Sequence, residues 1–248
     1  MFTPRALALV TPLLLAAACP VRAQETRPTT APAAVRVQRV SLRDCGPAAI
    51  AVDTGAGVCY AFDTTKCRLR LAWAGGFLDV SPPLADGVAP AAEVAGRVWW
   101  RDDRRPFVRI AGLPTTRPAT RAAPPTFTWP AEQGNVPPTV QFVGYDAANA
   151  PAVDFEYRVD GVRVRERIAP AAPAAAGVGA VVGLVRSFAV DPIPAGGEVR
   201  LAAEGDGGAT FVFAPASGAR GGKAVQLRGT SARAFEVRMT PRPRQEPL

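Results

Sequence analysis

The sequence contains no histidine. A Ser-His-Asp or Cys-His nucleophile system is therefore excluded. The usual zinc and non-haem iron ligand sets also need histidine, as does the Cys-x-x-Cys-His attachment of c-type haem. This absence removes the commonest hydrolytic chemistry, and it predicts a chain with no metal and no cofactor.

Lysine is nearly absent as well, since Lys66 and Lys223 are the only two. The formal net charge of +8 is thus almost entirely due to arginine. These arginines are scattered between apolar residues, and no block of five basic residues exists. Nucleic-acid binding needs basic side chains gathered on one face, so we expect no nucleic-acid partner.

Beyond residue 23 the sequence has no run of about 18 apolar residues, so no membrane-spanning helix is expected. The first 23 residues are typical of a cleavable signal peptide, with Arg5, an apolar stretch over residues 7–18 and a cleavage site after Ala23. We expect an exported protein, periplasmic or extracellular, that begins at Gln24. The alternative is lipid anchoring at Cys19, which lacks the usual preceding leucine.

Three cysteines remain after that cleavage, and export permits a disulfide. Cys59 and Cys67 flank a turn-rich stretch around residues 63–65, so they are the best-placed pair to face each other across a hairpin. Cys45 would then stay free. In the other interpretation, all three are small buried apolar side chains.

No segment of the mature chain shows a helical stripe with caps. Instead, apolar residues recur at every second position in short runs between Gly, Asp and Pro turns, which is typical of strands. Strands are expected at 35–42, 48–53, 58–62, 68–74, 77–80, 97–101, 107–110, 154–159, 162–168, 180–190, 199–203, 210–213, 223–228 and 234–239. The pattern predicts an all-β fold, an antiparallel β-sandwich of many short strands.

The chain divides by composition into a disordered Thr/Pro/Ala tether at 24–34, a β-sandwich domain at 35–240 and a tail at 241–248. Residues 111–130 are rich in proline and longer than most loops inside a compact domain. They either separate two subdomains or form a surface excursion from one sandwich.

Asp160-Gly161 lies between two alternating runs and predicts a tight hairpin, because both central residues of that turn need positive φ. The turn fixes the register. The expected opposite pairs are Val159 with Val162, Tyr157 with Val164, Val153 with Ile168, Asp154 with Arg167, Glu156 with Arg165, Arg158 with Arg163 and Phe155 with Glu166. Glu166 interrupts an otherwise apolar face, and we expect it at the rim of that face.

Four segments carry a family resemblance: YAFDTTKCRLRLAWAGGFLDV at 60–80, GRVWW at 96–100, VQFVGY at 140–145 and FEYRVDG at 155–161. Together they resemble a β-rich module of exported planctomycete and verrucomicrobial proteins. That module is often fused to c-type cytochrome domains in large predicted membrane-bound dehydrogenases. The resemblance implies no activity and no catalytic residue. Its usual neighbours suggest extracellular carbohydrate breakdown by association alone.

Trp99 and Trp100 precede a charged stretch that contains Asp102 and Asp103. In a strand the two rings point to opposite faces, so one can be buried while Trp100 is exposed beside the carboxylates. Such a surface is suited to stacking on a sugar ring. The alternative is a core tryptophan, an edge tryptophan and a charged turn.

Trp73 and Asp79 flank Gly75-Gly76, which permits an unusual backbone path or the close approach of a ligand. The alternative is a bend between two core strands with Asp79 at the turn. Trp73, Asp79, Trp100, Asp102 and Asp103 are therefore the candidate ligand-binding residues.

Paired carboxylates are the remaining catalytic route without histidine, since glycosidases use two carboxyl groups about 5–10 Å apart. The conceivable members are Asp63, Asp79, Asp102, Asp103, Asp154 and Glu156. The sequence does not indicate which two converge, so the catalytic residues are unknown.

These features predict an exported, non-catalytic β-sandwich module that binds a carbohydrate or a partner protein. One alternative is a glycoside-active or mutarotase-like enzyme with a carboxylate pair. The other is a structural accessory domain of an envelope redox complex.

Overall fold

The computed structural model describes residues 34–80, 91–102, 108–111, 138–172, 182–193, 197–202, 208–214, 219–221 and 224–242. The expected signal peptide and most of the tether, of the proline-rich 111–130 stretch and of the tail lie outside these ranges. The described residues belong to one compact unit, 32–248. No helix among them is long or apolar enough to cross a membrane.

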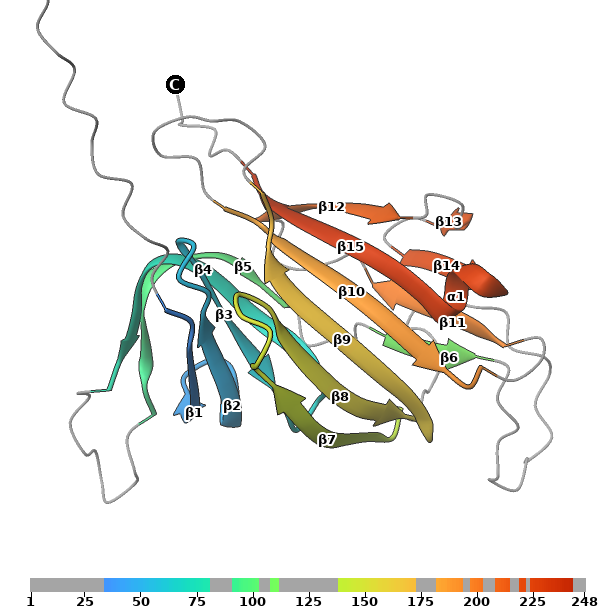
Figure 1. The fold of residues 1–248 in the computed structure, drawn as a ribbon, viewed down its shortest axis with the longest axis horizontal. Coiled ribbons are helices and arrows are strands. Elements are labelled where there is room, and N and C mark those ends of the chain that lie inside the picture. Colours follow the sequence, from blue (N-terminus) through green and yellow to red (C-terminus); the bar gives the residue numbers. More distant parts are fainter. Residues whose placement is uncertain are drawn as a thin grey trace, which may run out of the picture. The chain divides into compact units, whose positions relative to one another are not determined.

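Antiparallel strands dominate this unit, as Figure 1 shows, and the all-β prediction is confirmed. The elements are β1 (Arg36–Leu42), β2 (Gly46–Asp53), β3 (Val58–Asp63), β4 (Arg68–Asp79), β5 (Glu93–Arg101), β6 (Val108–Ala111), β7 (Val140–Asp146), β8 (Val153–Val159), β9 (Val162–Pro170), β10 (Leu184–Asp191), β11 (Glu198–Ala202), β12 (Ala209–Ala214), β13 (Ala219–Gly221), β14 (Ala224–Arg228), α1 (Thr230–Arg233) and β15 (Ala234–Pro241). They form a five-stranded sheet β1-β2-β3-β4-β5, a six-stranded sheet β12-β15-β10-β9-β8-β7 and a four-stranded sheet β13-β14-β11-β6.

The five-stranded sheet bends until its two edges meet. Leu42 at the end of β1 forms a parallel bridge with Ala92, just before β5, and the Ala92 N–H donates to the Ser41 carbonyl over 2.8 Å. The prediction of two separate strands at 68–74 and 77–80 is wrong, because β4 continues through Gly75 and Gly76 with a register shift. Figure 1 shows β4 and β5 bending there. The result is an incomplete small barrel.

Each face of this sheet carries a separate apolar cluster. Ala51, Cys59, Ala61 and Trp73 lie on the inside of the bend, where mostly small side chains leave room for one indole. The residues between them, such as Tyr60, face the main core.

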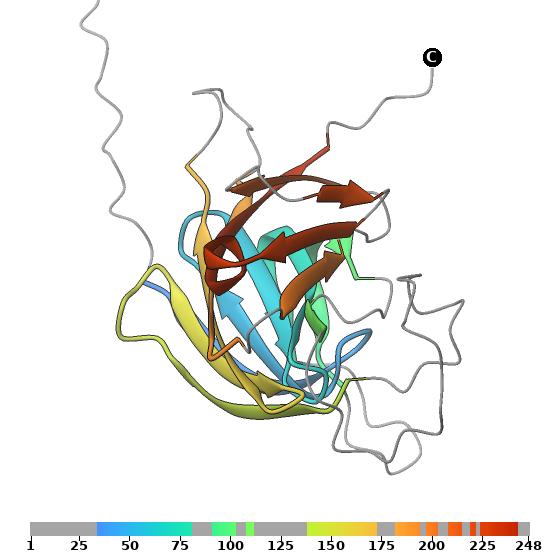
Figure 2. The same ribbon diagram turned by 90° about the vertical axis from the view of Figure 1, so that its right-hand side faces the viewer.

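The main core lies between the five-stranded sheet and the other two sheets. Figure 2 shows these two sheets curving around the blue and cyan strands. Phe62 of β3 stacks on Phe155 of β8 with ring centroids 4.2 Å apart, and Trp100 of β5 contacts Phe211 of β12 edge-on. Each such buried ring contributes roughly 1.5–3 kcal/mol of hydrophobic stabilisation. The core therefore draws on strands from both sides of the proline-rich stretch.

The β8–β9 hairpin has the predicted register at all seven pairs, including Phe155 opposite Glu166. Asp160 and Gly161 have φ of 50° and 85°, as the tight turn requires. Alternation then directs Val153, Tyr157 and Val159 into the core and leaves Asp154, Glu156 and Arg158 on the outer face.

Candidate functional site

Trp99 and Trp100 are both buried, with 7% and 1% of their surface exposed. The expectation that one ring would be exposed beside carboxylates is wrong. The cause is a register shift: Ala72 pairs with Trp100 but Trp73 pairs with Val98, so Trp99 is an extra residue in β5. A bulge of this kind turns two consecutive side chains towards one side, here the main core.

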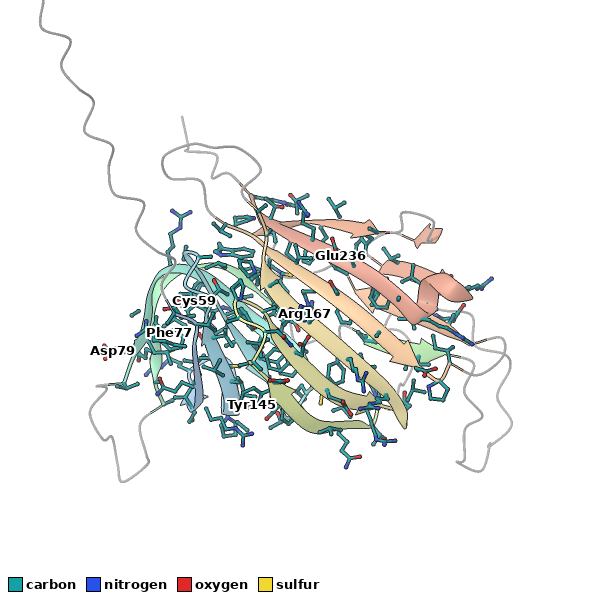
Figure 3. The ribbon with its side chains drawn as sticks, viewed as in Figure 1. Cys59, Phe77, Asp79, Tyr145, Arg167 and Glu236 are labelled. Atoms are coloured by element: carbon teal, nitrogen blue, oxygen red, sulfur yellow. The ribbon has the colours of Figure 1, made fainter. Side chains whose placement is uncertain are left out.

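Trp73 has no exposed surface either. Its indole N–H donates to the carbonyls of Gly76 and Phe77 over 2.9 and 3.1 Å, and its ring stacks on Phe77. Asp79 is exposed at the end of β4, near Phe77 in Figure 3. Trp73 and Trp100 lie in different apolar clusters, so the structure does not assemble them into one ligand platform.

Asp102 is buried and forms an ion pair with Arg68, with nitrogen and oxygen 3.2 Å apart. Asp103 lies outside the described residues. Asp63 accepts hydrogen bonds from the N–H and hydroxyl of Thr65 and from the N–H of Lys66, so it closes the β3–β4 turn. Asp63 and Asp102 thus have structural partners that account for their positions.

The predicted Cys59–Cys67 disulfide is wrong. Cys59 pairs with Trp73 across the β3–β4 hairpin, whereas Cys67 lies in the turn itself and faces the other side of the sheet. Cys45, Cys59 and Cys67 are unpaired buried thiols. Burial is the largest cause that raises the pKa of each to about 12, so all three remain protonated and poorly nucleophilic near neutral pH.

Glu166 is fully buried, so its expected place at the rim of the apolar face is wrong. One of its oxygens is 2.6 Å from Nε of Arg186, and the other accepts a hydrogen bond of 2.9 Å from the Tyr157 hydroxyl. Burial, and then the charge of Glu166, raise the pKa of Tyr157 well above its usual value. These three side chains line neither of the surface hollows that follow, so we assign them to the fold.

The remaining candidate acids, Asp154 and Glu156, lie on the outer face of β8. Glu156 pairs with Arg163 through two hydrogen bonds of 2.7 and 2.6 Å, and Arg165 approaches it at 3.4 Å. The hydrogen bonds from Arg163 lower the pKa of Glu156. Asp154 pairs with Arg167 at 3.2 Å, on the side of the sheet that faces the viewer in Figure 3.

A hollow of about 510 Å³ opens beside these acids, around Gly144 of β7. The pairing of β7 with β8 shifts between Phe142 and Gly144, and Gly144 then lies opposite Glu156. A side chain at Gly144 would meet no atom within 4 Å of its Cβ, so the glycine leaves this space open. The Gly144 hollow is lined by Val143, Gly144, Tyr145, Asp146, Asp154, Phe155, Glu156 and Arg165.

A second cavity, of about 560 Å³, lies where the edges of two sheets approach each other. Its walls come from β1, β2 and the β3–β4 turn on one side and from β7 on the other. This edge groove is lined by Arg39, Val40, Ser41, Pro47, Ala48, Ala49, Ile50, Thr64, Phe142 and Val143. Both volumes fall in the range of about 300–1,000 Å³ that is common for small-ligand sites.

Val143 lines both cavities, and Tyr145 lines the Gly144 hollow. Its half-buried ring packs on Phe155, and the Arg39 guanidinium lies over it, 5.3 Å from the ring centroid. Figure 3 shows Tyr145 at the junction of the first sheet and β7. Register shifts occur on both strands here, between Val40 and Leu42 and at Val143. Bulges often re-aim side chains beside functional sites, so this junction is the candidate binding site.

Sequence patterns did not identify this junction, because alternation does not indicate which edge strands become neighbours in space. The only signal was the family-like segment at 140–145. Among the described residues, no group of three or more Cys, Asp or Glu is arranged to hold a metal ion.

Residues 60–166 match a family described as a domain of unknown function (DUF6797). The matched stretch runs from β3 into β9 and includes β7 and the Gly144 hollow, but not β1. No curated protein and no solved structure is significantly similar to the chain.

Proposed function

We propose that this protein is an exported, non-catalytic β-sandwich module that binds carbohydrate at the junction of β1 and β7. The main support is the contact between Arg39, which lines the edge groove, and Tyr145, which lines the Gly144 hollow together with three carboxylates. Sugars offer an apolar ring face and closely spaced hydroxyls, and both kinds of group have counterparts here.

The Gly144 hollow supplies acceptors and donors together. Asp146, Asp154 and Glu156 contribute carboxylate oxygens, and Arg165 contributes N–H donors. An ionised carboxylate has about four acceptor positions, so the arginine partners of Asp154 and Glu156 leave lone pairs for hydroxyl groups of a ligand. Neighbouring sugar hydroxyls need this combination, because each both donates and accepts.

The arrangement of these side chains supports carbohydrate binding better than glycoside hydrolysis. A glycosidase needs one carboxyl group that is protonated near its working pH, which requires a raised pKa. Glu156, the acid at the centre of the hollow, has a lowered pKa because Arg163 hydrogen-bonds to its ionised form. It therefore stays anionic and serves as a hydrogen-bond acceptor instead of a general acid.

The test is a glycan array with the wild-type protein and with Gly144→Ile. Isoleucine suits a strand and would occupy part of the hollow, and its Cβ would meet no existing atom within 4 Å. The matched control is Ala214→Ile, at an exposed position of β12, the opposite edge strand of the same sheet. We expect wild type and the control to bind the same glycans, and Gly144→Ile to bind them about tenfold more weakly or worse.

Two results would overturn the proposal: no glycan bound by the wild-type protein, or unchanged binding by Gly144→Ile. In the first case the exposed Val143 on the edge strand β7 would point to a protein partner instead.

A further inference from the structure

We infer that the bound carbohydrate is acidic, and that the edge groove receives a uronate sugar with its carboxylate on Arg39. This inference rests on the proposed function and specifies its ligand. It follows from where Arg39 lies, from the charge of the groove and from the chemistry of the surrounding side chains.

Arg39 is held at the mouth of the groove. It lies opposite Ile50 in the β1–β2 pairing, so it is on the side of β1 that faces the main core, yet its side chain remains exposed. Its guanidinium carbon lies 5.3 Å from the centre of the Tyr145 ring, and this cation–π contact favours a position of the charge beside the groove.

Arg39 is also the single charged side chain among the described residues that line the groove. The ion pairs of the described residues give it no carboxylate partner. By contrast, Arg36, three residues earlier on the same strand, forms an ion pair with Asp53 over 2.7 Å. The groove therefore carries a positive charge that an anionic ligand group can neutralise.

A carboxylate fits this site. The planar guanidinium binds a carboxylate through two parallel N–H···O bonds, and the apolar walls from Val40, Ile50 and Phe142 reduce solvent screening of that pair. The Thr64 hydroxyl donates to the Ala48 carbonyl over 2.7 Å, and its oxygen keeps acceptor capacity for a sugar hydroxyl.

The charge distribution also orients the ligand. The Gly144 hollow offers an acidic group no comparable partner, because the arginines beside it are already paired with Glu156 and Asp154. The uronate therefore lies in the edge groove, and the uncharged hydroxyls of the adjoining sugar lie towards the Gly144 hollow.

The experiment compares oligomers of galacturonate, glucuronate and mannuronate with their methyl esters, which keep the sugar and mask the charge. Binding is measured by calorimetry for wild type, Arg39→Gln and Arg39→Lys. The matched control is Arg158→Gln, an exposed arginine at the hairpin end whose one side-chain hydrogen bond within the described part of the chain goes to the Gly161 carbonyl. Circular dichroism verifies that all variants are folded.

We expect wild type to bind one of the acids about tenfold or more tightly than its ester, because a charge-assisted bidentate pair is lost on esterification. Arg39→Gln should reduce binding of the acid to the level of the ester and leave ester binding unchanged. Arg39→Lys should restore part of the preference, and Arg158→Gln should match wild type.

Equal binding of acid and ester, or an Arg39→Gln variant that keeps the preference, would overturn the inference and leave the proposed carbohydrate function standing. Failure to bind any glycan, charged or neutral, would overturn both. Tighter binding of a polyglutamate peptide than of any uronate would replace the sugar with an acidic protein segment.

Discussion

Glu166 places a carboxylate in the middle of an apolar core, and its two partners explain why it is tolerated there. Arg186 of β10 supplies the opposite charge and Tyr157 of β8 supplies a hydroxyl donor, and all three are buried. A buried charge is costly unless it is both paired and hydrogen-bonded. The group therefore couples three neighbouring strands of the six-stranded sheet.

Removal of one partner from the Glu166–Arg186–Tyr157 group should destabilise the protein strongly. Glu166→Gln leaves the Arg186 charge buried without its counter-ion, and we expect it to lower the free energy of unfolding by about 3–5 kcal/mol. Tyr157→Phe removes only the hydroxyl donor and should cost about 1.5–3 kcal/mol. Urea denaturation followed by circular dichroism measures both values.

The double variant Glu166→Leu/Arg186→Met is the control for coupling. Replacement of both charges by apolar side chains leaves no isolated ion, so the double variant should be more stable than Glu166→Gln. A double variant less stable than Glu166→Gln would mean that the two side chains contribute independently.

At the level of elements, the β8–β9 hairpin depends on the backbone freedom of one glycine. Gly161 has φ of 85°, whereas Gly144 on β7 has none of the positive φ recorded for other glycines, and a Cβ would be in open space at both positions. Gly161→Ala should therefore cost about 1–2 kcal/mol through backbone strain alone. Gly144→Ala should change stability by about zero or raise it slightly, because glycine weakens a strand.

Urea unfolding of the two alanine variants tests this contrast directly, since neither substitution creates a clash. Equal losses at Gly161 and Gly144 would show that strain in the tight turn does not limit stability.

A sequence can specify an element whose signal is local. The hairpin was predictable because Asp160-Gly161 fixes its register locally, over a few residues. The extra residue at Trp99 was not, because it depends on how β5 pairs with β4, and no turn signal marks it. For the same reason the alternation rule placed Trp100 on the wrong side.

At the scale of the whole unit, the candidate site combines strands that are about 100 residues apart. Arg39 is on β1 and Tyr145 is on β7, and they meet because the bent first sheet and the six-stranded sheet bring two edges together. Period-two patterns indicate which side chains point inward wherever no bulge interrupts the strand. They contain no information on which edges become neighbours, so the fold class was predictable from sequence and the site was not.

The first sheet has its own small apolar cluster, but its other face depends on the rest of the chain. Tyr60 and Phe62 are fully buried, and Phe62 stacks on Phe155 of β8. A fragment of residues 34–111 would expose these rings and lose much of the hydrophobic stabilisation that holds the sheet. We therefore expect this fragment to lack a cooperative thermal transition and to bind the apolar dye ANS.

The intact protein should unfold in one step, because both halves of the chain share the main core. Three of its four tryptophans, Trp73, Trp99 and Trp100, lie in the first sheet, so their fluorescence reports mainly on that sheet, whereas far-ultraviolet circular dichroism reports on all three sheets. Urea curves from the two signals should coincide within error. Separate midpoints, together with a folded 34–111 fragment, would show that the bent sheet is an independent unit and that its apolar outer face is not needed to hold it.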